Sequence, residues 1–185
     1  MTTGPSGPAA PSTGTPRQWI LVAIPVLVVS GFIASLLDEG DTQALLFAIS
    51  SIASVVAAFL LAVVHLRAGR VLSGAGFAAL GVLAIAGHVA GYTGAVPESI
   101  FGNIGLLFLP ALLLVAAEAW SFIWARAAAA LAGIGFAIWS FKVVLGGEPA
   151  DIESPIVIAA FTLFTVANIG WVMTIMAEGD GPGTP

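Results

Sequence analysis

Cysteine is absent from this sequence of 185 residues, and charged residues are scarce. The lack of cysteine excludes disulfides, thiolate metal sites, iron–sulfur clusters and cysteine nucleophiles. Charged residues make up 8% of the chain, whereas soluble domains carry about 25%, so this chain has too few charges to cover a water-exposed surface. Five basic residues stand against ten acidic ones, which argues against nucleic-acid binding because that requires clustered Lys and Arg.

Catalytic motifs are also missing. The sequence has no glycine-rich phosphate loop, no Gly-x-Ser-x-Gly elbow and no paired carboxylates inside an apolar run. Its two histidines, His65 and His88, would lie about 27 Å apart along a membrane-spanning helix pair, at 1.5 Å of rise per residue. A single metal ion cannot bridge that distance. We therefore expect no enzymatic activity, no metal site and no cofactor.

Long apolar runs dominate the chain, which is 59% hydrophobic with a mean hydropathy of +1.08. Six runs approach the roughly 20 residues that a helix needs to cross a bilayer core. The sequence predicts an all-α polytopic membrane bundle of six transmembrane helices over residues 18–177. Disordered tails are expected at 1–17 and 178–185. The six runs cover residues 19–37, 44–66, 71–92, 100–117, 121–145 and 156–177.

The break between the fourth and fifth runs is the least marked one. The segment from Glu118 to Arg126 contains neither Gly nor Pro. A turn is nevertheless expected there, because one uninterrupted helix over residues 97–145 would be far too long for the bilayer. A Glu118–Arg126 ion pair would hold this turn.

Four of the five basic residues fall on one side of the membrane when the six spans alternate in direction. The positive-inside rule makes that side cytoplasmic. Both termini are then cytoplasmic, in the cell (inner or plasma) membrane. Lys142 is the exception, near the outer end of the fifth run, where it can reach the headgroups or Glu148. The four topology anchors are Arg17, Arg67, Arg70 and Arg126.

Small residues recur at helical spacing in the third and fifth runs. Close approach between small side chains is what allows membrane helices to associate, so these two runs are expected to be the central helices. Gly/Ala faces of this kind also suit a homo-oligomer or a larger membrane complex. The residues concerned are Gly74, Ala78 and Gly81 in the third run and Ala129, Gly133 and Ala137 in the fifth.

Polar residues inside the apolar runs indicate a solute pathway, because each of them costs free energy in hydrocarbon. His88, Tyr92, Lys142 and Asn168 fall in the outer half of the bundle, where Lys142 and His88 would attract an anion. His65, beside two arginines, is expected at the membrane interface. The predicted function is transport or channelling of a small organic anion. The alternative is a structural or accessory subunit of a larger membrane complex.

His65, Gly69, Phe77 and Gly81 follow one another at a spacing that resembles the acetate/succinate permease family of six-helix transporters. In that family an acidic residue stands at the position of His65, and Gly, Phe and Gly stand at the other three. The family's first-helix signature, Asn-Pro-Ala-Pro-Leu-Gly-Leu, is replaced here by residues 15–19, TPRQW. The resemblance implies a six-helix architecture and permeation of small solutes, but it assigns no substrate-binding residue.

Overall fold

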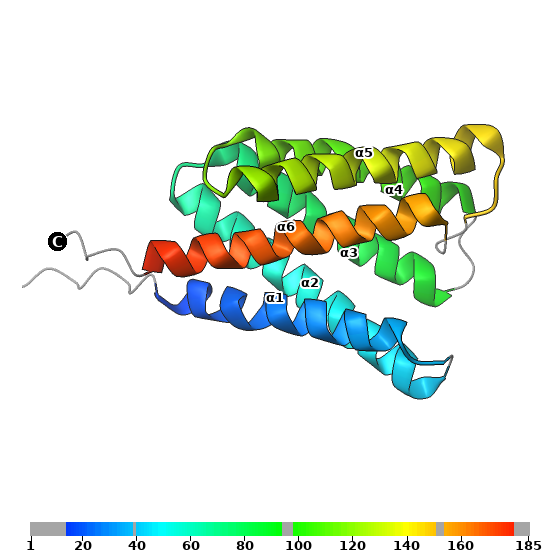
Figure 1. The fold of residues 1–185 in the computed structure, drawn as a ribbon, viewed down its shortest axis with the longest axis horizontal. Coiled ribbons are helices and arrows are strands. Elements are labelled where there is room, and N and C mark those ends of the chain that lie inside the picture. Colours follow the sequence, from blue (N-terminus) through cyan, green and yellow to red (C-terminus); the bar gives the residue numbers. More distant parts are fainter. Residues whose placement is uncertain (1–13, 39, 94–97, 151–153, 180–185) are drawn as a thin grey trace, which may run out of the picture.

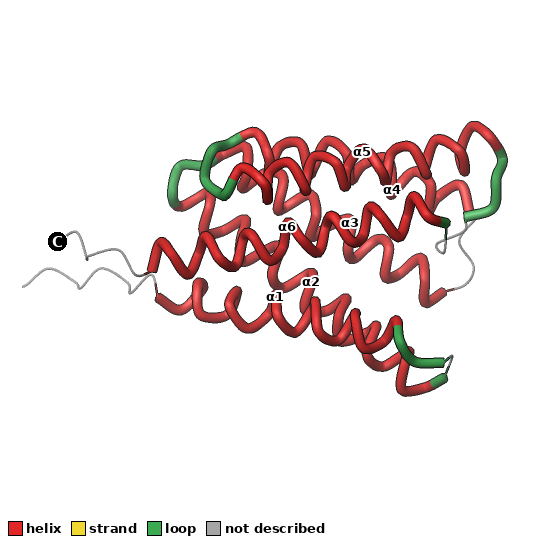
Figure 2. The backbone as a smooth tube through the Cα atoms, in the orientation of Figure 1, coloured by secondary structure: helices red, strands yellow, loops and turns green. Residues whose placement is uncertain are grey.

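The computed structural model describes residues 14–38, 40–93, 98–150 and 154–179, and these form six helices joined by short turns (Figure 1). Every regular element in this part of the chain is a helix (Figure 2). The expected all-α membrane bundle is confirmed. Five helices are long and apolar enough to cross a membrane, and α4 has a shorter apolar stretch, Gly102–Ala117. The helices are α1 (Gly14–Ser35), α2 (Asp41–Arg67), α3 (Val71–Thr93), α4 (Glu98–Ala117), α5 (Ile123–Gly146) and α6 (Pro155–Gly179).

The helix ends follow local backbone chemistry. α1 begins at Gly14, inside the segment expected to be a tail, because Pro16 is tolerated in a first helical turn. After α2, Gly69 adopts a left-handed φ of 74°, and the N–H of Arg70 donates to the carbonyl of His65 at 2.9 Å. This motif satisfies a terminal carbonyl and turns the chain into α3. The predicted break between the fourth and fifth runs is confirmed, since α4 ends at Ala117 and α5 begins at Ile123.

The six helices form a ring in which each helix packs against its neighbours in sequence and α6 returns to α1. Figure 1 shows α1, α5 and α6 as one layer and α2, α3 and α4 as the other. The expectation that α3 and α5 form a centre is wrong, because within the described residues their Cα atoms nowhere come within 8 Å. The same holds for α1 with α4, α2 with α5, and α3 with α6. Buried apolar side chains from all six helices fill the interior between them.

The outward face of the ring is apolar. Every helix has at least one large apolar side chain that is more than half exposed. Such continuous apolar exposure suits contact with lipid and would be a liability in water. The chain is thus a multi-pass membrane protein. Representative side chains, one from each helix in order, are Trp19, Ile52, Val82, Leu107, Leu145 and Ile158.

The two ends of the bundle carry different charges. The start of α1, the end of α6 and the α2–α3 and α4–α5 connections lie together (Figure 1), and we call this the arginine end. The opposite end, with the α1–α2 and α5–α6 connections, carries Asp38, Asp41 and Glu148, and we call it the acidic end. The arginine end carries Arg17, Arg67, Arg70 and Arg126.

Candidate functional site

Four aromatic rings from distant parts of the chain meet inside the arginine half, and we call them the His65 cluster. They belong to His65 of α2, Phe77 of α3, Trp120 of the α4–α5 connection and Trp171 of α6. His65 stacks on Phe77 with ring centroids 5.3 Å apart and lies 4.1 Å from Trp120. Phe77 meets Trp171 edge to face at 4.9 Å. Because α3 and α6 are opposite in the ring, this contact crosses the interior of the bundle.

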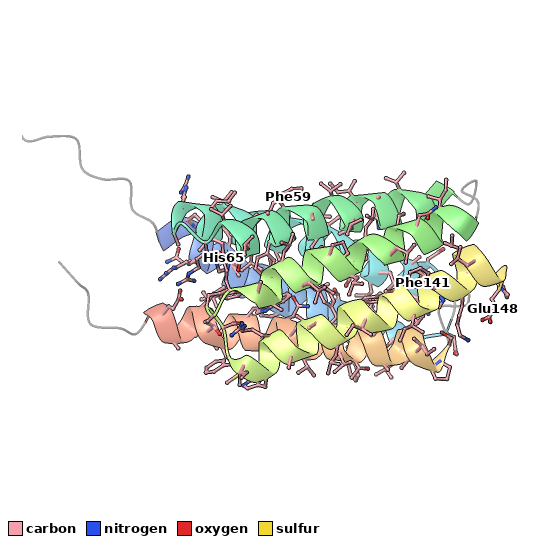
Figure 3. All side chains as sticks on the ribbon, turned by 90° about the horizontal axis from the view of Figure 1, so that it is seen from above. Phe59, His65, Phe141 and Glu148 are labelled. Atoms are coloured by element: carbon pink, nitrogen blue, oxygen red, sulfur yellow. The ribbon has the colours of Figure 1, made fainter. Side chains whose placement is uncertain are left out.

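The sequence of α2 explains why His65 points inward. α2 buries a stripe in which Ala53, Ala57, Leu61 and His65 follow at intervals of four residues, and such residues share one helix face. His65 is only 1% exposed. Figure 3 shows it between the helices near the arginine end. The expectation that His65 lies at the depth of the membrane interface stays a prediction, since His65 is in the last turn of α2. Its burial between helices was not expected, and the four-residue stripe is the signal that would have predicted it.

The His65 cluster contains polar atoms that the protein does not pair. Among the described residues, neither ring nitrogen of His65 nor the indole nitrogen of Trp171 has a hydrogen-bond partner. A neutral imidazole has one donor and one acceptor, and an indole has one donor. A buried polar group without a partner costs about 1–3 kcal/mol. The cluster thus offers two donors and one acceptor inside an aromatic enclosure.

Salt bridges of Glu178 join three segments of the chain next to the His65 cluster. Its carboxylate, at the end of α6, accepts a hydrogen bond from Arg70 at 2.9 Å and one from Arg17 at 3.3 Å. Arg70 belongs to the α2–α3 turn and Arg17 to the start of α1. The three side chains are between 29% and 40% exposed. The Arg17–Glu178 salt bridge thus joins α1 to α6 at the arginine end, and the Arg70–Glu178 salt bridge joins the α2–α3 turn to α6.

Glu118 and Arg126 cap helix ends, and the expected pair between them is replaced by these contacts. Glu118 accepts the backbone N–H groups of Leu72 at 3.2 Å and Ser73 at 2.9 Å, at the positive end of the α3 dipole. Arg126 donates to the carbonyl of Ala116 at 2.7 Å, at the end of α4. Partial desolvation raises the pKa of Glu118, but the hydrogen bonds from Ser73 and Leu72 outweigh it, so that this pKa lies below its ordinary value.

Comparison of the chain with family models, with curated proteins and with solved structures gives no match. The geometry of the site therefore carries the functional argument.

Two of the predicted pathway residues, Lys142 and Asn168, lie at different depths. Lys142 is half exposed and pairs with Glu148 at 3.4 Å, at the far end of the bundle from His65 (Figure 3). Asn168 is 3% exposed, and its side-chain N–H donates to the carbonyl of Phe164 in its own helix at 2.9 Å. At 1.5 Å of rise per residue, Lys142 lies about 6 Å and Asn168 about 20 Å from the acidic end. They do not form one site.

The other two predicted pathway residues lie on α3. His88 is half-buried and borders a shallow hollow of about 250 Å³ between α2 and α3. The side chain of Tyr92 falls outside the described residues. In the described part of the chain, no group of three or more His, Asp or Glu side chains is placed to hold a metal ion. The hollow is lined by Ser51, Ile52, Val55, Val56, Ile85, His88 and Val89.

Proposed function

We propose that the protein is a membrane permease or channel for small polar solutes, with a pathway between the two helix layers that the His65 cluster closes at the arginine end. The observation that carries the proposal is the burial of unpaired polar atoms where opposite helices face each other. A purely structural core would favour Leu or Phe at His65, because these leave no hydrogen bond unmade. A transport site uses polar atoms that pair with the passing solute.

The distribution of arginines predicts how the proposed permease is oriented in the membrane. By the positive-inside rule the arginine end faces the cytoplasm, both termini lie there, and the His65 cluster is an inner gate in the cell membrane. His65 and Phe77 are also two of the four positions that resemble the acetate/succinate permeases. This resemblance makes small carboxylic solutes and their analogues the first ones to test.

The test is uptake by proteoliposomes that contain the purified protein. Labelled acetate and a panel of other small solutes are offered from mildly acidic to mildly basic pH, with protein-free vesicles as the blank. We expect uptake above the blank, a loss of at least about tenfold in His65→Leu, and no change in the control Phe141→Ala, whose side chain is 51% exposed on the outer face of α5. Uptake at the blank level for every solute and pH would contradict the proposal.

An accessory or scaffolding role is the second candidate, favoured by dense packing between neighbouring helices. A Cβ added at Gly76 of α3 would meet backbone atoms of Ala111 and Val115 in α4 at 2.7 and 2.9 Å. Two apolar hollows of about 250 and 260 Å³ also lie side by side over α1, α2 and α3, sharing Ile52 and Val56. A lone monomer in mild detergent, without a second copy or a co-purifying protein, would count against this role.

A further inference from the structure

We infer that the His65 cluster passes its solute as a neutral, planar, hydrogen-bonding molecule, such as a protonated carboxylic acid or a small amide, and excludes the corresponding anion. This inference rests on the proposed function and narrows its substrate class. It departs from the small organic anion that the sequence alone favours. Three features of the site support it.

The first feature is the set of unpaired polar atoms. His65 and Trp171 together offer two donors and one acceptor. A carbonyl oxygen next to an O–H or N–H group complements such a set, because it accepts and donates at adjacent positions. A carboxylate only accepts, so the acceptor nitrogen of His65 would stay unpaired beside it.

The second feature is that three of the four arginines at the arginine end are already engaged. The fourth, Arg67, is exposed and lies two residues after His65, on a different face of α2. Arg70 and Arg17 bind Glu178, and Arg126 binds carbonyls at the end of α4. An anion entering the His65 cluster would therefore lack a cationic partner. Burying an unpaired ion is far more unfavourable than burying a neutral hydrogen-bonding group.

The third feature is the shape of the enclosure. His65 lies against Phe77 and Trp120, and Trp171 packs against these two rings, with ring centroids between 4.1 and 6.5 Å apart. The rings are in contact, so a solute passes only when they separate. A planar molecule needs the smallest separation, roughly one ring thickness of 3.5 to 4.0 Å.

The test compares acetamide with acetate, which have nearly the same shape and differ in charge, at one slightly basic pH. Proteoliposome flux is followed by stopped-flow light scattering for acetamide and urea, and by label uptake with a potential-sensitive dye for acetate. We expect acetamide flux about tenfold above protein-free vesicles, acetate transport without a change in membrane potential, and loss of the acetamide flux in His65→Leu but not in Phe141→Ala.

Two outcomes overturn the inference and are distinguishable. Acetate uptake that charges the membrane while acetamide stays at the blank would overturn the neutral-solute inference and leave the proposed transport function standing. Failure of acetamide, urea and acetate alike to exceed the blank would remove the inference and count against the proposed function as well.

Discussion

The arginine end and the acidic end of the bundle differ in what their charges connect. Glu178 binds Arg17 and Arg70, which are 161 and 108 residues away along the chain. At the acidic end, Lys142 binds Glu148, only 6 residues away. Figure 1 correspondingly shows α1 and α6 close together at the arginine end and farther apart toward the acidic end. Among the described residues, ion pairs between distant segments join the ring at the arginine end, where the His65 cluster also lies, whereas the ion pair at the acidic end is local in sequence.

The largest expected difference in the free energy of unfolding is between variants of a buried phenylalanine and of a lipid-facing one. Phe77 in the His65 cluster is 0% exposed, whereas Phe141 near the acidic end is 51% exposed (Figure 3). Phe77→Ala should lower the free energy of unfolding by about 3–5 kcal/mol, because it leaves a cavity. Phe141→Ala should lower it by less than about 1 kcal/mol. Unfolding in detergent micelles measures both, and equal losses would contradict the contrast.

The next largest change in the free energy of unfolding is expected when two glycines of α3 are replaced in turn. A Cβ at Gly76 would meet the backbone carbonyl of Ala111 at 2.7 Å, whereas a Cβ at Gly87 would meet nothing within 4 Å. Gly76→Ala should therefore lower the free energy of unfolding by about 1–3 kcal/mol, since α3 and α4 must move apart. Gly87→Ala should be neutral or stabilise by up to about 1 kcal/mol through helix propensity. A stable Gly76→Ala protein would show that the packing is looser than described.

A smaller effect concerns the carboxylate cap on α3. The pKa of Glu118 lies below its ordinary 4.5 in the folded protein, so its stabilisation is complete above about pH 4.5 and is lost as the pH falls through the folded pKa. Glu118→Gln should cost about 1 kcal/mol at neutral pH, and the gap from wild type should close on acidification. Unfolding curves at several pH values measure this gap. A stability difference between the two proteins that widens as the pH falls would contradict this prediction.

The smallest change in the free energy of unfolding is expected for variants of the two glutamates that form ion pairs at opposite ends of the bundle. All three ion pairs, two at Glu178 and one at Glu148, are partly exposed, so each is worth at most about 1 kcal/mol. Glu178→Gln breaks two long-range contacts and should cost a few tenths to about 1 kcal/mol, while Glu148→Gln should have no measurable effect. Cross-linking between cysteines introduced in α1 and α6 would report whether the seam loosens in the first variant. Equal behaviour of the two variants would remove the contrast between the ends.

Hydropathy predicted the helices because crossing a bilayer requires long apolar runs, and length alone predicted the break after Ala117. The ring order was not predictable in the same way, since interior and lipid-facing side chains are equally apolar. In α2, for example, Leu61 is 2% exposed and Phe59 is 38% exposed within one apolar run. The burial of His65 was not predicted, because the arginines next to it pointed only to a membrane interface, although its four-residue spacing from Leu61 placed it on the buried face.

The free energy of unfolding of His65→Leu tests the central claim most directly. If the unpaired imidazole is kept for the solute, the variant should be as stable as the wild type or more stable by about 1–3 kcal/mol, while its solute uptake is lost. Leu61→Ala, on the same buried stripe, should lose about 2–5 kcal/mol and shows that the assay detects core damage. A loss above about 2 kcal/mol in His65→Leu would contradict the account, because it would mean that the imidazole serves the fold.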